Sequence, residues 1–165
     1  MNRRLFLAAI PAALAAGCGF QLRRLDGIPL ASLYIDAPPG SAIAARIREM
    51  LALNQGTRLT ATAAEAEGVL KIAREERNKT ILTVSGAGLV TEYRLSLVLT
   101  YSIQDKDART LAEPETIELN RDMTYSDSQL LAKGDEEQLL YRSMDDGAAV
   151  RIIRRLQALK PGNGA

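Results

Sequence analysis

The sequence offers few side chains that could carry out chemistry, and one cysteine stands out among them. Cys18 is the only cysteine in the 165 residues, and histidine is absent. A single thiol cannot form an internal disulfide, so Cys18 is a small buried side chain, a nucleophile or a point of covalent attachment. The lack of histidine excludes histidine-based triads, histidine zinc sites and histidine acid–base pairs.

The residues before Cys18 favour covalent attachment. Arg3 and Arg4 precede a short apolar run that ends in small residues, which is the pattern of a secretory signal. The run is too short to cross a hydrocarbon core of ~30 Å, which takes about 20 helical residues. The segment LAAGC (14–18) resembles the lipobox of bacterial lipoproteins. This resemblance implies acylation of Cys18 and removal of residues 1–17.

The residue after the cysteine bears on the destination. In lipoproteins of this type an aspartate there implies retention in the inner membrane, whereas this chain has Gly19, which implies sorting to the outer membrane. The segment NRRLFL (2–7) also resembles a twin-arginine signal. It lacks the usual basic residue after the apolar pair. Ordinary export is therefore favoured, and the twin-arginine route stays open.

The charge balance argues against nucleic acid as a partner. Without residues 1–17 the chain keeps all 20 acidic residues but loses two of its 21 basic ones, which leaves a net charge of −1. Such a chain has no overall field that attracts nucleic acid. Gly-rich phosphate loops and nucleophile elbows are absent. Asp145 and Asp146 would point ~100° apart on a helix and read as solvated rather than catalytic. We expect no cofactor and no metal, and these residues favour no enzymatic activity, although an enzymatic role stays open at this point.

The first third of the mature chain predicts a strand and a helix. Residues 30–38 place apolar side chains two apart before Pro38 and Pro39, which predicts a short strand. Ser41 then caps a helix that ends before Gly56. Its apolar face comprises Ile43, Ile47, Met50 and Leu51. Residues 57–68 read as a connector.

The middle of the chain predicts long strands. In residues 69–84, Leu70, Ile72, Leu82 and Val84 share one parity, and we expect a bulge around 75–78. The turn SGAG (85–88) follows. Apolar and polar residues then alternate over 89–103, which predicts a strand with one buried face. A further strand is expected over 117–125, with Pro114 suiting an edge or a strand start.

The last element is a helix after a possible capping box at Ser126 and Gln129. Its apolar stripe is formed by Leu140, Met144, Ala148, Ile152, Leu156 and Leu159. Gly134 and Gly147 are weak points of this helix. The element order β-α-β-β-β-α predicts an α+β fold, a two-layer sandwich with both helices on one face of a mainly antiparallel four-stranded sheet. We expect one domain over 18–160 and a loose tail over 161–165.

Three stretches and the order of elements together resemble one known family. The stretches are GCGFQLR (17–23) at the mature start, TEYRLSLVLTYSI (91–103) and LLAKGDEEQLLYRSM (130–144). The chain is similar in these features to the lipopolysaccharide-assembly lipoprotein family LptE. The resemblance implies a non-enzymatic lipoprotein at the periplasmic face of the outer membrane. Such a protein plugs the β-barrel LptD, assists the assembly of the barrel, binds lipopolysaccharide and helps deliver it to the cell surface.

The resemblance also implies where the ligand binds. Lipid A carries phosphates, which Lys or Arg side chains recognise. Family members have a lysine at the position of Lys133 that is implicated in ligand contact. Read from the sequence alone, Lys133 is a solvated lysine near a helix start. Some relatives carry an arginine in the turn where this chain has Gly86. Arg94 and Arg121, expected on polar strand faces, are candidate substitutes or ordinary solvated residues.

Two other classes of function stay open. The chain is alternatively a different outer-membrane assembly or scaffolding lipoprotein on a similar sandwich, or a periplasmic enzyme. Co-purification with a barrel would favour the lipopolysaccharide role, other partners would favour a scaffold, and turnover of a substrate would show an enzyme. The absence of histidine and the acylation expected at Cys18 argue against the enzyme.

Overall fold

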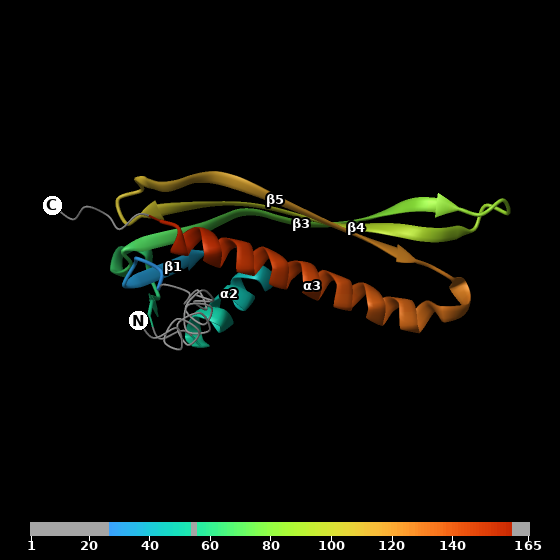
Figure 1. The fold of residues 1–165 in the computed structure, drawn as a ribbon, viewed down its shortest axis with the longest axis horizontal. Helices are drawn as coiled ribbons and strands as arrows, with labels where there is room; N and C mark the ends of the chain where they lie inside the picture. Colours follow the sequence, from blue (N-terminus) through green and yellow to red (C-terminus); the bar gives the residue numbers. More distant parts are fainter. Residues whose placement is uncertain (1–26, 54–55, 160–165) are drawn as a thin grey trace, which may run out of the picture.

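The computed structural model of the chain describes residues 27–53 and 56–159, and shows an elongated two-layer domain (Figure 1). Cys18, the signal segment 1–17 and the tail 161–165 lie outside the described residues. The described elements are β1 (Ser32–Asp36), α2 (Ala42–Leu53), β2 (Arg58–Leu59), β3 (Gly68–Val84), β4 (Val90–Asp105), β5 (Thr110–Thr124) and α3 (Leu130–Gln157), with short 3-10 helices η1 (Ala63–Glu65) and η2 (Asp127–Gln129). Both helices lie on the same side of the sheet, which confirms that part of the predicted fold.

The sheet differs from the prediction in strand number and direction. It has five strands in the order β2-β1-β3-β4-β5. Strand β1 pairs in parallel with both β2 and β3, and only β3, β4 and β5 form an antiparallel meander. The prediction of four strands was wrong because β2 has two residues, too few for any periodicity. The parallel pairing is possible because α2 forms the crossover from β1 to β3.

Strand β4 carries the centre of the core, as its alternation predicted. Its odd-numbered residues from Leu95 to Ile103 are all buried. Leu95, Leu97 and Leu99 have no exposed surface. The even-numbered residues face the other side of the sheet, where the Thr100 hydroxyl hydrogen-bonds to that of Thr116 at 3.0 Å. One face of the sheet is therefore packed under the helices and the other is polar.

Strand β3 contains a bulge, but earlier than predicted. The register against β4 shifts between Ile72 and Arg74 rather than around 75–78. This shift exchanges the two faces of the strand for residues 74–81, and two further shifts follow between Ile81 and Val84. Leu70 and Ile72 are buried as expected, whereas Leu82 and Val84, which have the same parity, are 41% and 54% exposed. The prediction of one apolar parity along the whole strand was therefore wrong.

Strand β5 is longer than expected. It begins at Thr110 rather than near Ile117, and it is an edge strand of the sheet, which accommodates Pro114. At the other end of the sheet, α2 begins as predicted. The backbone N–H of Ala44 donates to Ser41 Oγ at 3.0 Å, so Ser41 is the N-cap. Ile43, Ile47 and Leu51 of α2 are buried, and Met50 is half-buried.

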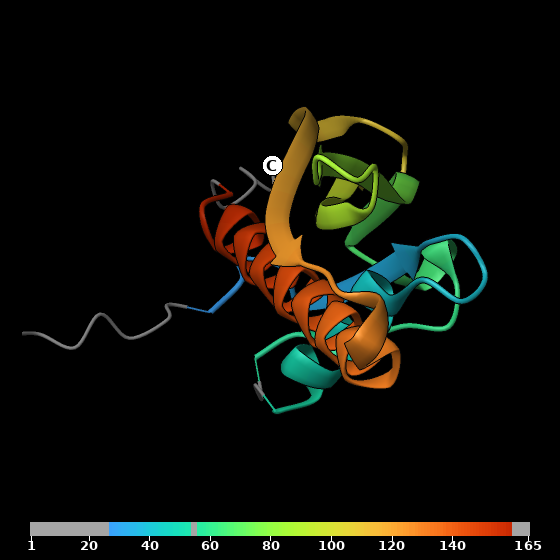
Figure 2. The same ribbon diagram turned by 90° about the vertical axis from the view of Figure 1, so that its right-hand side faces the viewer.

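Helix α3 runs through 28 residues without a break at Gly134 or Gly147. The capping box is wrong, because Ser126 Oγ hydrogen-bonds to Ser128 Oγ at 2.9 Å instead of capping the backbone. The buried residues of α3 all lie in its second half, and they are Met144, Asp145, Ala148, Ala149, Ile152, Ile153 and Leu156. The view along the molecule shows this helix crossing beneath the sheet beside α2 (Figure 2).

Candidate functional site

Lys133 lies where α3 begins, beside the end of β5. Its Nζ donates to Glu136 Oε2 at 2.7 Å and to Thr124 Oγ1 at 3.1 Å. Only 13% of the side chain is exposed. The solvated lysine expected from the sequence is therefore wrong for this residue, because Lys133 ties the start of the helix to the sheet. Its ammonium group is already paired within the protein.

A second lysine occupies the same region. Lys79 Nζ donates to Glu137 Oε2 at 2.6 Å and lies 4.4 Å from the ring centroid of Tyr93 and 5.9 Å from that of Tyr125. The two tyrosine rings meet edge to face at 5.0 Å. The hydrogen bond from Lys79 to Glu137 raises the lysine pKa above its ordinary value, so the ammonium form is favoured.

The two lysines belong to one cluster. Lys133 and Glu137 are four residues apart on α3 and therefore share a helix face. Thr124, which contacts Lys133, directly precedes Tyr125. We call Lys79, Tyr93, Tyr125, Lys133 and Glu137 the distal cluster. It combines two cations and two aromatic rings, a set suited to a phosphorylated ligand, although Glu137 and Glu136 now neutralise the cations.

The other basic candidates are not part of this cluster. Arg94 lies on the polar face of the sheet and binds Asp122 through two hydrogen bonds of 2.8 and 2.9 Å. Arg121 pairs in register with buried Leu95, so it lies on the helix side and not on the polar face that the sequence predicted. It is exposed at the edge strand, where its guanidinium donates to the Asn120 carbonyl at 2.8 Å. Gly86 lies in the β3–β4 turn with open space around its Cα.

A polar seam joins β3 to the helices farther along the sheet. Arg77 contacts Asp145 at 2.7 Å and Glu75 at 3.1 Å, and the Ser41 hydroxyl donates to Glu75 at 2.5 Å. Asp145 is 9% exposed, so the expectation of a solvated carboxylate was wrong. Burial raises the pKa of Asp145 above its ordinary value, even though the hydrogen bond from Arg77 lowers it.

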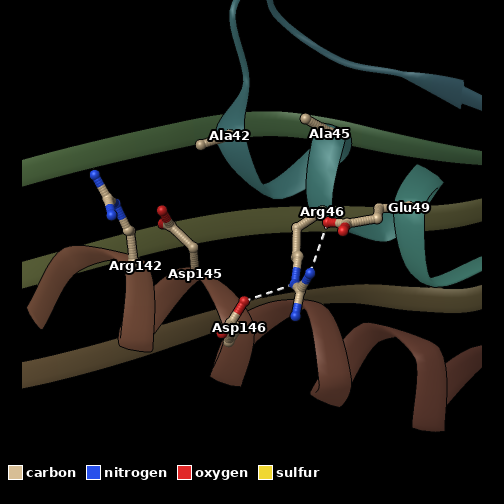
Figure 3. A pocket seen from close by; sticks show the side chains of 7 residues that line it. All are labelled: Ala42, Ala45, Arg46, Glu49, Arg142, Asp145 and Asp146. Atoms are coloured by element: carbon tan, nitrogen blue, oxygen red, sulfur yellow. Dashed lines mark hydrogen bonds and ion pairs between the residues drawn. The ribbon is translucent and has the colours of Figure 1, made fainter. Parts of the chain in front are cut away.

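A shallow pocket of about 450 Å³ lies between α2 and α3 (Figure 3). Arg46 crosses it, with Nη1 at 2.6 Å from Glu49 and Nε at 2.7 Å from Asp146. Arg142 and Asp145 line the same pocket. Because its basic and acidic groups lie side by side and pair with each other, we interpret the pocket as a contact region between α2 and α3. Within residues 27–53 and 56–159, no cluster of acidic, histidine or cysteine side chains could hold a metal.

Sequence reasoning missed Glu75, Arg77 and Lys79 as inward-facing residues. The signal that could have found them is the charged stretch REERNK (74–79) inside an otherwise apolar strand. In a strand, alternate residues of this stretch must face the core side in any register, and the bulge next to Ile72 decides that these are Glu75, Arg77 and Lys79. The aromatic pair of the distal cluster had no signal, because Tyr93 and Tyr125 are distant in the sequence.

Solved structures define the class of protein. The chain resembles the solution structure of uncharacterized lipoprotein B from Nitrosomonas europaea, with 30% identity, a TM-score of 0.74, and coverage of 85% of this chain and 91% of that one. It also resembles rare lipoprotein B from Shewanella oneidensis, with 25% identity, a TM-score of 0.64, and coverage of 76% and 92%. The fold and these likenesses define an α+β lipoprotein domain.

The family follows from a second comparison. The model of the lipopolysaccharide-assembly family LptE matches residues 30–156, which is most of the chain. The chain belongs to this family, as the sequence resemblance indicated. No curated protein matches it significantly. None of the helices in the part of the chain that the structure describes is long and apolar enough to cross a membrane.

Proposed function

We propose that this chain is an outer-membrane lipoprotein that, together with the β-barrel LptD, assembles lipopolysaccharide at the cell surface. In this role it plugs the barrel, assists its assembly and binds lipopolysaccharide, without enzymatic activity. The observation that carries the proposal is the family match over residues 30–156. The polar outer face of the sheet suits a plug in a water-filled lumen, because its side chains pair with each other and remain solvated.

The attachment to the membrane is through Cys18 in this proposal. Three acyl chains, each buried CH₂ contributing ~0.8 kcal/mol, would hold the domain stably at a bilayer. Replacing Cys18 with Ala should leave an uncleaved or soluble form in fractionated cells. Mass spectrometry that found an unmodified thiol on the mature wild-type protein would reject the anchor.

The barrel partnership is tested by a pull-down of the tagged, lipidated chain from detergent-solubilised outer membranes. We expect an LptD-like barrel to co-purify in stoichiometric amount. Co-purification of other envelope proteins without a barrel would favour the scaffolding alternative. Turnover of an isolated substrate by the purified chain would favour an enzyme and overturn the proposed role.

The ligand contact is assigned to Lys133 in this proposal, with Arg94 and Arg121 as lesser basic candidates. A charge-assisted contact contributes ~1.5–3 kcal/mol, so Lys133→Ala should weaken binding of lipopolysaccharide about ten- to a hundredfold. Arg94→Ala is the matched control, since Arg94 is held by Asp122 on the opposite face. Equal binding by wild type and Lys133→Ala, with weaker binding by Arg94→Ala, would move the site to the outer face.

A further inference from the structure

The two halves of α3 are attached to the sheet by different kinds of contact. From Met144 onward seven residues of the helix are buried. None of the described residues from 130 to 143 is buried. The exposed large apolar side chains include Leu130, Leu131 and Leu139, which are 62%, 88% and 61% exposed. Three of the four leucines in the first half therefore face outward, and only Leu140 is partly buried against the core, which is unlike an ordinary amphipathic helix on a sheet.

Polar contacts hold this first half in place. Lys133 donates to Thr124 at 3.1 Å, Glu137 accepts from Lys79 at 2.6 Å, and the Tyr141 hydroxyl donates to the Asn78 carbonyl at 3.0 Å. Residues 133, 137 and 141 follow one another at intervals of four and so lie along one face. Water and salt compete with contacts of this kind, whereas they do not compete with the packing of the second half.

Beneath this part of the helix lies a small group of side chains separate from the main core. Met123 is only 2% exposed, yet it is not part of the contiguous core that contains Leu95 and Ile152. It is paired in register with Tyr93, one of the two rings of the distal cluster. Leu140 and Tyr141 of this half are partly buried against the main core, so detachment would free that contact but leave the fully buried core residues packed. It would uncover an apolar and aromatic surface beside the ammonium group of Lys79.

Lys133 cannot take a new anion while it keeps its present partners. Its ammonium group is bound to Glu136 and Thr124, and its side chain is 13% exposed. When the helix moves away, the contact to Thr124 is lost and the pair with Glu136, which lies within the helix, becomes solvated, so that an anionic ligand can compete for the ammonium group. Regions held by few apolar contacts open at a lower free energy than the core, so such a movement is accessible without global unfolding.

We propose that residues 130–141 form a strap that detaches from the sheet as a unit, and that Lys133 accepts a phosphate-bearing ligand only when the strap is open. The detachment of the strap is inferred from the burial and contacts of residues 130–141. The binding of a ligand by Lys133 rests on the proposed function. If the closed form predominates, the apparent affinity is the intrinsic affinity reduced by the fraction of open molecules.

Hydrogen–deuterium exchange on the full lipidated chain in detergent tests the strap. We expect the amides of residues 133–141 to exchange at least about tenfold faster than those of residues 145–156. Tyr141→Phe removes one strap contact without changing charge and should speed exchange several-fold in the strap only. Arg94→Gln, which breaks an ion pair that does not involve α3, is the matched control and should leave the strap unchanged. Uniform exchange along α3 would overturn the proposal.

Binding of purified lipid A in the same detergent tests whether opening of the strap controls ligand binding by Lys133. Tyr141→Phe should tighten the apparent affinity by the same factor by which it speeds strap exchange, because both follow the open fraction. Lys133→Gln should abolish this gain. An affinity that does not change while the strap opens more often would overturn the gating of Lys133. The barrel pull-down does not depend on the strap, so its failure would count against the proposed function alone.

Discussion

The two halves of α3 differ in what they bury, although they form one continuous helix. The second half places Ala148, Ile152 and Leu156 against the sheet with no exposed surface. The first half places Lys133, Glu137 and Tyr141 toward the sheet and leaves three leucines in solvent. One helix thus combines a segment of the hydrophobic core with a segment attached through polar groups.

The cause of the difference lies in β3 rather than in the helix. After the bulge next to Ile72, Glu75, Arg77 and Lys79 take the inward positions opposite Leu99, Leu97 and Leu95. As a result, Lys79 meets Glu137 and Arg77 meets Asp145 on α3. A single extra residue in a strand changes how a distant helix is held.

The largest effect should come from a charge placed in the core to which the second half of α3 belongs. Leu97 has no exposed surface, so Leu97→Asp buries an unpaired carboxylate and should cost more than about 4 kcal/mol, enough to prevent folding. Leu139→Asp is the matched change in the polar half and should alter the free energy of unfolding by less than about 0.5 kcal/mol. Urea denaturation measures both. Similar losses for the two variants would remove the distinction between the halves.

Removal of Arg77, the cation of the polar seam between β3 and the helices, should have the next largest effect. Arg77→Met leaves Glu75 and Asp145, both largely buried, without their shared partner. We expect a loss of roughly 2–4 kcal/mol, reduced from the fully buried case because Arg77 is partly exposed. Arg94→Met breaks an exposed pair and should cost at most ~1 kcal/mol. If the two variants are equally stable in urea, the seam does not contribute beyond an ordinary surface pair.

Two glycines sharpen the comparison at a smaller scale. A Cβ on Gly147 would lie 3.7 Å from Leu119, an ordinary contact, and a Cβ on Gly134 would meet open space. Ala in place of a helical Gly is favourable by about 0.8–1 kcal/mol. Gly147→Ala should raise the free energy of global unfolding by roughly this amount. Gly134→Ala should slow exchange of the strap amides yet leave global unfolding nearly unchanged if the strap opens first.

The smallest effect concerns Asp145 and depends on pH. Its pKa is raised in the folded protein, so the carboxyl favours folding below its ordinary pKa of about 3.9, and this contribution is lost as pH rises through the raised value. Asp145→Asn does not titrate. The variant should therefore gain stability relative to wild type as pH rises from 3 to 7. Denaturation curves at several pH values that show the opposite trend would contradict the direction of the shift.

The sequence by itself determined the features that depend on local periodicity. The alternation in β4, the apolar face of α2 and the Ser41 cap each follow from residues close together in the chain, and the structure has them as predicted. The family resemblance was also readable from short motifs in order. The attachment at Cys18 and the ligand role of Lys133 stay predictions.

Only the tertiary structure decided how the elements pair. The two-residue strand β2, the parallel pairing of β1 with β3 and the position of the bulge have no period that a sequence window can detect. The partners of Lys79 and Arg77 lie 58 and 68 residues away along the chain. Such contacts are fixed by which strands and helices lie side by side, and a local pattern carries no information about that choice.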